Sequence, residues 1–200
     1  MRKIVTSVVL LFCMIALYGQ KYTPYIIITK KGERIECLAE MKKDFITYRL
    51  GPKTEKVKLY SNEVKYAASV EGDSIMLFSG IPVYTSLSQT SPTNVGWVRF
   101  LTDPRVEPVS IYVYYSTFLG QVQENYGCYR QGDEYGQNLI ASNTFKAKYK
   151  ETISKYFSDC PSLVEYINGD DFRLLNLTGQ VKYDDFKNVV QEYNQCEDKK

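Results

Sequence analysis

The hydrophobic period of this chain changes once, near residue 142, and this change constrains its fold more than any other feature. Before that point apolar and polar residues alternate in short runs, as in "YIIITKKGERIECLAEM" (25–41), where Gly32 supplies the positive φ of a hairpin loop. Beyond it, apolar residues recur every three or four positions, which is the period of an amphipathic helix. We therefore predict an α+β protein, with an antiparallel β region followed by a C-terminal bundle of about three helices.

Two strands of the β region carry specific predictions. In the second strand the alternation places Ile35, Cys37 and Ala39 on one face, which we expect to point inward. Both faces of "VSIYVYYSTF" (109–118) are apolar or aromatic, so we expect a central strand that is covered on both sides. The polar stretch "TSLSQTSPTN" (85–94) is a loop and the best candidate for an internal boundary or a mobile segment.

The three predicted helices are marked by start signals and by apolar stripes. Ser142 or Asn143 can cap the first helix, and Pro161 suits the first position of a second helix at 161–168. The stripes of the first and third helices consist of residues at helical spacing: Phe145, Tyr149, Ile153 and Phe157, and then Phe186, Val189, Val190 and Tyr193.

The N-terminus has the pattern of a secretory signal peptide at 1–19. A positively charged tripeptide is followed by an apolar run with small residues near its end. The run is shorter than the roughly 20 residues that a spanning helix needs, which disfavours a signal anchor. The large Phe12 before Cys13 disfavours a lipid-modified cysteine. We therefore expect an exported protein of the periplasm, the cell surface or the medium, with no membrane-spanning segment in its mature form.

The remaining chain is predicted to consist of a β-rich region at 20–135 and a helical region at 136–200 that packs on it. The full chain has 25 Lys and Arg against 23 Asp and Glu. Because Arg2 and Lys3 leave with the signal peptide, the mature chain has equal numbers of acidic and basic residues. Binding to nucleic acid or to an anionic membrane surface relies on a basic surplus, so neither is expected.

The complete absence of histidine excludes several classes of enzyme. Ser-His-Asp and Cys-His hydrolases need an imidazole base, and this chain has none. Gly-rich phosphate loops and closely spaced Cys pairs are also missing, so no cofactor and no metal are predicted. The adjacent acids Asp170-Asp171 and Asp184-Asp185 leave open a carboxylate-based hydrolase of envelope glycans, although acids at a helix start more often cap the helix. No catalytic residue is assigned.

Three aromatic residues of the β region are the candidates for ligand binding. Trp97, Tyr112 and Tyr114 could form a platform for a sugar or a peptide, or they could form the packing layer beneath the helices, which we favour. The function expected from these observations is that of a non-enzymatic binding or interaction protein of the cell envelope. Its partner would be an envelope protein or a small ligand, and the glycan hydrolase is the alternative.

Four cysteines remain after removal of the signal peptide, and one disulfide is predicted among them. Cys160 lies between the first and second predicted helices, and Cys196 follows the third. If the helices run up, down and up, as short connections favour, these two residues lie at the same end of the bundle. Metal binding lacks ligands and nucleophilic attack lacks a base, so we predict a Cys160–Cys196 bridge. Cys37 and Cys128 could form a second bridge or remain buried thiols.

Two blocks of sequence resemble a group of exported proteins. "YIIITKKGERIECLAE" and "VKLYSNEVKY" resemble a small β module near the start of many exported proteins of Bacteroidota-type bacteria. "YKETISKYFSDCPSLVEYI" and the later "VVQEYNQC" resemble the helical tail of the same group. The resemblance implies export, an N-terminal β module and a C-terminal helical tail, and it supplies no catalytic residue.

Cleavage of the signal peptide tests the expected export directly. The charged start, the apolar run and the small residue Gly19 place the cut near that glycine. Mass spectrometry of the mature protein should therefore find its N-terminus between residues 17 and 22. An intact Met1, or a diacylglyceryl group on Cys13, would contradict the prediction.

Overall fold

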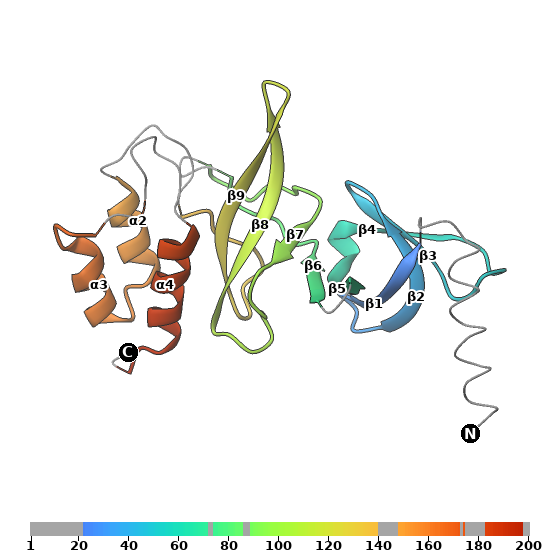
Figure 1. Ribbon diagram of the computed structural model, residues 1–200, viewed down its shortest axis with the longest axis horizontal. Coiled ribbons are helices and arrows are strands. Elements are labelled where there is room, and N and C mark those ends of the chain that lie inside the picture. The colour runs from blue at the N-terminus through green and yellow to red at the C-terminus, as the bar shows by residue number, and fades with distance from the viewer. Residues whose placement is uncertain are drawn as a thin grey trace. The chain divides into compact units, whose positions relative to one another are not determined.

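Nine strands and three helices make up the part of the chain that the structure describes (Figure 1). The structure is a computed structural model and describes residues 22–71, 74–85, 89–139, 148–172, 174 and 183–197. The strands form an antiparallel sheet and the helices follow it, which confirms the predicted α+β class. The signal peptide, the proposed cap at Ser142 or Asn143, and Phe145 lie outside the described residues.

The elements follow the predicted order, with the strands first and the helices last. The strands are β1 (Thr23–Thr29), β2 (Arg34–Met41), β3 (Phe45–Arg49), β4 (Val57–Tyr60), β5 (Val64–Glu71), β6 (Ser74–Ser79), β7 (Val98–Phe100), β8 (Val109–Phe118) and β9 (Gln121–Arg130). The helices are α2 (Lys148–Tyr156), α3 (Pro161–Asn168) and α4 (Tyr183–Asn194), and a short 3-10 turn, η1 (Ser61–Glu63), precedes β5. The strand order in the sheet is β4-β3-β2-β1-β5-β6-β7-β8-β9.

The chain divides into two compact units, Met1–Met76 and Leu77–Lys200, and the division falls inside β6. The sequence favoured the loop at 85–94 as an internal boundary. This loop instead belongs to the second unit, where the backbones of Val83 and Thr93 exchange two hydrogen bonds of 2.9 and 2.8 Å. Backbone pairing thus keeps a polar, turn-rich stretch inside one unit.

In the first unit, a tight turn and a regular register decide which residues face the core. Gly32 has a φ of +86° and its N–H donates to the Thr29 carbonyl at 3.0 Å, which closes the β1–β2 hairpin. The predicted inward row of Ile35, Cys37 and Ala39 is buried, which confirms the prediction. It joins the other buried apolar residues of this unit: Tyr25, Ile27, Ile46, Val64 and Ala67.

Strand β8 is the centre of the second unit. It pairs with β7 on one side and, through ten consecutive residue pairs, with β9 on the other. The side chains of residues 109–114 are buried on both faces of the strand, which confirms the predicted central strand. The next residue, Tyr115, is 49% exposed, so the cover ends there.

Different layers cover the two faces of β8. On one face Val109 and Ile111 join a core cluster with the apolar residues of the helical region: Tyr149, Ile153, Phe157, Leu163, Ile167, Phe186, Val189, Val190 and Tyr193. On the other face the Tyr112 ring lies against Gly127 and Gly136, and a Cβ on either glycine would overlap the ring. Glycine is therefore required at both positions for the chain to close over Tyr112.

The helix boundaries follow their sequence signals. Helix α3 has its predicted bounds, with Pro161 in its first turn. Gly169 follows it with its N–H bonded back into the helix, although its φ of −59° is not left-handed. Asp184 and Asp185 lie in the first turn of α4, where the helix dipole favours acids. No helix among the described residues is long and apolar enough to cross a membrane.

Substitution of Tyr112 tests this packing. The Tyr112 side chain is fully buried, and its hydroxyl has no hydrogen-bond partner among the described residues. Tyr112→Ala should lower the free energy of unfolding by about 3–5 kcal/mol, because it leaves a large cavity. Tyr112→Phe removes only the unsatisfied hydroxyl, and should leave that free energy unchanged or raise it by about 1 kcal/mol. Urea denaturation of the purified variants measures both effects.

Tyr115→Ala is the matched control in the same strand. Because Tyr115 is half exposed, its loss should change the free energy of unfolding by less than about 1 kcal/mol. A Tyr112→Phe variant less stable than the wild type by more than this amount would show that the hydroxyl makes a stabilising bond, and would contradict the prediction.

Candidate functional site

The predicted aromatic platform is mostly inside the protein. Tyr112 is fully buried and Tyr114 is 3% exposed, and their ring centroids lie 6.4 Å apart. The Asn138 side-chain amide donates to the Tyr114 hydroxyl at 3.3 Å, from a segment that covers this face of β8. Trp97, just before β7, is partly buried. These positions favour a packing role, and ligand binding by the three residues stays a prediction.

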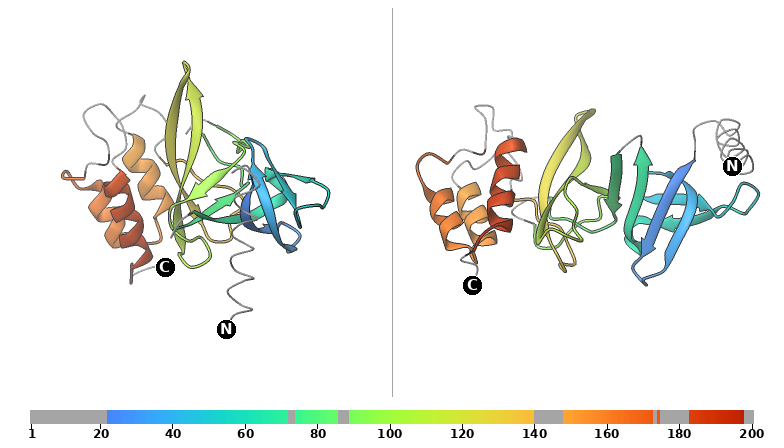
Figure 2. Two further views of the ribbon diagram at one scale, coloured as in Figure 1. Left: turned by 45° about the vertical axis from the view of Figure 1, so that its right-hand side comes forward. Right: turned by 60° about the horizontal axis from the view of Figure 1, so that its bottom comes forward.

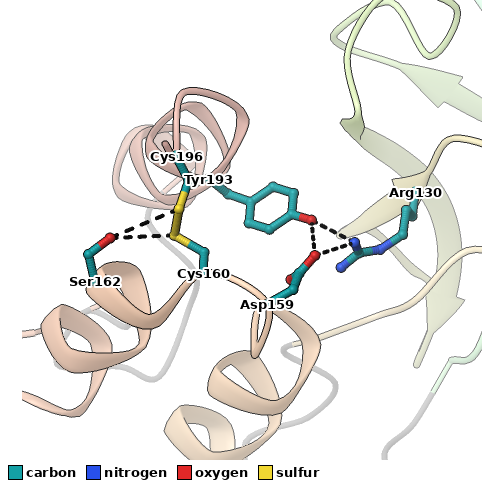
Figure 3. Close-up of a disulfide and its surroundings, with 6 residues drawn as sticks. All are labelled: Arg130, Asp159, Cys160, Ser162, Tyr193 and Cys196. Atoms are coloured by element: carbon teal, nitrogen blue, oxygen red, sulfur yellow. Dashed lines mark hydrogen bonds and ion pairs between the residues drawn. A yellow bond between two sulfur atoms is a disulfide. The ribbon is translucent and has the colours of Figure 1, made fainter. Parts of the chain in front are cut away.

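The predicted disulfide between Cys160 and Cys196 is present, with their Cα atoms 6.3 Å apart (Figure 3). It joins the residue before α3 to the second residue after α4, and the Ser162 hydroxyl lies 3.6 and 4.0 Å from the two sulfurs. The bridge closes a loop with a sequence separation of 36, which the chain-entropy model converts into about 3–4 kcal/mol of stabilisation. The helical region is therefore covalently tied at one end.

The other two cysteines, Cys37 and Cys128, are free and buried. Burial raises the pKa of the Cys37 thiol to about 11, and burial likewise raises that of Cys128. Both sulfurs are thus protonated at neutral pH and are poor nucleophiles. Of the two alternatives left by the sequence, the structure has the buried thiols and not the second bridge.

A polar cluster beside the disulfide links the sheet to the helices (Figure 3). The Arg130 guanidinium at the end of β9 donates to the Asp159 carboxylate at 3.0 Å, the Tyr193 hydroxyl at 2.6 Å and the Tyr156 carbonyl at 2.9 Å. The Tyr193 hydroxyl in turn donates to the same Asp159 oxygen at 2.7 Å. One arginine thus binds the end of α2, the turn before α3 and α4.

The chemistry of this cluster is structural. Burial acts to raise the pKa of Asp159, but the hydrogen bonds from Arg130 and Tyr193 outweigh it and hold that pKa below its usual range. Burial and the bond to Asp159 raise the pKa of Tyr193 to about 12. At neutral pH the cluster therefore holds a paired carboxylate, a paired guanidinium and a neutral phenol, and it contains no group poised to transfer a proton.

A second connection at the base of β8 uses an amide side chain. Asn194, the last residue of α4, accepts a hydrogen bond of 3.0 Å from the Val109 N–H and donates one of 2.9 Å to the Val109 carbonyl. Its side chain therefore pairs with β8 as a neighbouring strand would. Neither Asn194 nor the Arg130 cluster was predicted, because their members come from distant parts of the chain and form no local motif.

A groove of about 890 Å³ lies between α3 and α4, beside the disulfide. Among the described residues that line it are four carboxylates, Asp171, Asp185, Glu192 and Glu197, and no lysine or arginine. Each of the two aspartate pairs noted in the sequence thus contributes one member. Within the described ranges, no three His, Cys, Asp or Glu side chains lie close enough together to hold a metal ion.

Unlike the acidic groove, the far end of the β8–β9 hairpin exposes apolar side chains. Tyr115, Leu119 and Val122 are exposed by 49, 87 and 71%, and they lie beyond the covered part of β8. The connecting residues Leu119 and Gly120 have φ values of +50° and +79°, as a tight two-residue hairpin turn requires. Figures 1 and 2 show this part as a narrow two-stranded ribbon that projects from the second unit. We call residues 115–125 the projecting hairpin.

Comparisons with protein-family models, curated proteins and solved structures find no match to this chain. The resemblance to exported proteins of Bacteroidota-type bacteria therefore stays a prediction.

Replacement of Asp159 tests the polar cluster through its pH dependence. Because the pKa of Asp159 is lowered in the folded state, its contribution to stability is present above the unfolded-state pKa of about 3.9 and is lost as the pH falls through the lower folded-state value. Asp159→Asn should lower the free energy of unfolding by about 1–3 kcal/mol at pH 7. Urea denaturation should show that this difference from the wild type shrinks below about pH 4.

Asp103→Asn is the matched control. The pKa of Asp103 is also lowered, chiefly by its hydrogen bond to Arg105, but this ion pair is local and exposed. Its loss should cost less than about 1 kcal/mol. Equal effects of the two replacements at pH 7 would contradict a special role for the cluster at Asp159.

Proposed function

We propose that the protein is exported to the cell envelope and acts there as a non-enzymatic interaction protein whose contact element is the projecting hairpin. The observation that carries the proposal is the exposure of Tyr115, Leu119 and Val122 at the end of a strand whose first six residues are fully covered. Exposed apolar groups gathered on one projecting element are typical of contact surfaces.

The base of the hairpin is well suited to hold such an element in place. Arg130 at the end of β9 and Val109 at the start of β8 are both bonded to the helical region. Tyr112 packs tightly beneath the covering segment on the other face. The exposed end therefore extends from a fixed base, which reduces the conformational entropy that the hairpin loses when a partner binds.

The charge of the hairpin indicates the kind of contact. Glu124 is the only charged residue in 115–125, and its carboxylate accepts a hydrogen bond from the Tyr126 hydroxyl at 2.6 Å. A nearly uncharged surface offers apolar and backbone contacts, and it does not attract a polyanion or an anionic membrane. This supports a protein partner.

The alternative is a carboxylate-based hydrolase of envelope glycans that uses the acidic groove between α3 and α4. In its favour, the groove brings together acids from both aspartate pairs. Against it, Asp171, Glu192 and Glu197 are exposed, whereas a glycosidase holds its general acid in a buried, apolar setting. The interaction protein is therefore the better supported function.

A binding measurement with hairpin variants tests the proposal. The purified mature protein is mixed with envelope fractions of the producing cells, and the bound fraction is measured by co-sedimentation. Leu119→Ser/Val122→Ser should weaken binding roughly tenfold or more, because two apolar side chains no longer contribute to the contact. Thermal melts should confirm that the variant stays folded.

Val106→Ser is the matched control, because Val106 is 73% exposed but lies outside the hairpin. It should bind as the wild type does. Unchanged binding by the double hairpin variant, or an equal loss with Val106→Ser, would refute the hairpin as the contact element. Release of reducing sugar from envelope glycans by the wild type would favour the hydrolase instead.

A further inference from the structure

In the part of the chain that the structure describes, the outer edge of β9 is paired near its base and unpaired beyond it. Near the base, the backbones of Cys128 and Gln137 exchange two hydrogen bonds of 2.8 Å. Towards the tip, no strand among the described residues pairs with this side of β9, which is the last strand in the sheet order. Residues 121–124 are exposed.

The hydrogen-bonding pattern shows which residues face this open edge. The backbone of Cys128 bonds to Gln137, on the side of β9 that faces away from β8. Ile111, which lies opposite Cys128 in β8, accepts a backbone hydrogen bond from Leu101 on the side that faces away from β9. Ile111 and Cys128 therefore form a non-hydrogen-bonded pair. The pattern alternates along an uninterrupted register, so Val122 and Glu124 also direct their N–H and carbonyl groups outward.

Residues 121–125 carry few of the features with which proteins prevent strand addition, and Glu124 is the only charged residue among them. Residues 121–125 contain no proline and no lysine, and the register with β8 runs through them without a bulge. An open, regular edge of this kind is a template for a further strand.

We propose that a second copy of this chain adds its own β9 antiparallel to this edge, with the two-fold axis at Gln123. The inference rests on the proposed function, because it names the partner that binds one edge of the projecting hairpin. The edge is complementary to itself: Gln121, Gln123 and Asn125 project from one face, where the two glutamines carry amide donors and acceptors. The Asn125 amide nitrogen donates to the Ser116 hydroxyl and the Gln123 carbonyl, so Asn125 contributes its amide oxygen as an acceptor. Antiparallel pairing about Gln123 places amide opposite amide along this row.

Other registers are disfavoured by the residues that they bring together. An axis at Glu124 places two carboxylates opposite each other. An axis at Asn125 brings Val122 opposite Cys128 of the second copy, where Gln137 already pairs. An axis at Val122 needs the turn residue Gly120, whose φ is +79°, to continue a strand. The axis at Gln123 instead sets Val122 opposite Glu124 and forms about four backbone hydrogen bonds.

Cysteine cross-linking of the full mature chain tests this register. Gln123 lies on the axis in a non-hydrogen-bonded pair, whose Cα atoms are about 4.5 Å apart in antiparallel sheets. This distance is within the range for a disulfide, so Gln123→Cys should form a covalent dimer under mild oxidation with copper phenanthroline. The dimer band on a denaturing gel should disappear when the sample is reduced.

Two further variants and two controls make the test specific. Gln121→Cys and Asn125→Cys should each remain monomeric alone and should cross-link when they are mixed. Thr117→Cys, exposed on β8, measures random collision. The parent chain, whose free thiols Cys37 and Cys128 are buried, gives the background.

Sedimentation velocity supplies a test that needs no oxidation. The wild type should form a dimer whose fraction rises with concentration, because an interface of this kind is small and dissociates on dilution. Val122→Pro removes an outward N–H from the edge and should abolish the dimer. Its melting curve shows whether it is folded, and the cross-linking series does not depend on it.

The outcomes separate the inference from the proposed function. Cross-linking of Gln123→Cys no stronger than that of Thr117→Cys, with a monomer at all concentrations, overturns the dimer. Cross-linking of Asn125→Cys alone overturns the register. If Leu119→Ser/Val122→Ser still loses envelope binding in either case, the proposed function stands without the dimer. If the dimer forms but the double variant binds the envelope fraction as the wild type does, the dimer stands and the hairpin is not the envelope contact.

Discussion

Strand β8 is longer than the layers that cover it, and the organisation of the second unit depends on this mismatch. Six of its ten residues, Val109 to Tyr114, are buried on both faces. The helical region covers one face, and the segment around Gly136 and Asn138 covers the other. Beyond Tyr114 the exposure of β8 rises, with Tyr115 and Thr117 exposed, while the pairing with β9 continues to Phe118, so the ribbon projects as a consequence of the lengths of its elements.

The helical cover is held at the base of the hairpin by connections of different kinds. Apolar burial supplies most of the stabilisation, but it is non-directional and does not by itself fix where the helices lie along the strand. The Cys160–Cys196 bridge joins two helix ends, while Arg130 and Asn194 bond the helical region to particular residues of β9 and β8. A bridge worth about 3–4 kcal/mol is a large share of a domain's net stability of about 5–15 kcal/mol.

Local sequence signals predicted the elements well, because each depends on neighbouring residues. The start of α3 follows from Pro161, and the buried row of β2 follows from the alternation around Cys37. The disulfide needed one further step, the alternating direction of three helices joined by short connections. These predictions share one property: they use spacing along the chain and the geometry of a single motif.

The features that sequence reasoning missed depend on contacts between distant segments. The sequence favoured a packing role for Tyr112 and Tyr114 but placed them beneath the helices, whereas the segment with Gly136 and Asn138 covers them. Arg130 meets Asp159 and Tyr193 across 29 and 63 positions of the chain, so no motif marks the cluster. The same holds for the amide of Asn194, which is not usually expected to pair with a strand.

The two outermost strands of the sheet order show how differently this chain treats its edges. Strand β4 has four residues, and the Lys58 ammonium lies 3.9 and 4.4 Å from the ring centroids of Phe45 and Tyr60. A short edge that carries a lysine resists the addition of another strand. Strand β9 has ten residues, no lysine and no proline, and within the described ranges its outer side is paired around Cys128 and not towards the tip. The chain thus has blocking features at one edge that residues 121–125 mostly lack, and this difference supports the strand pairing proposed for the outer part of β9.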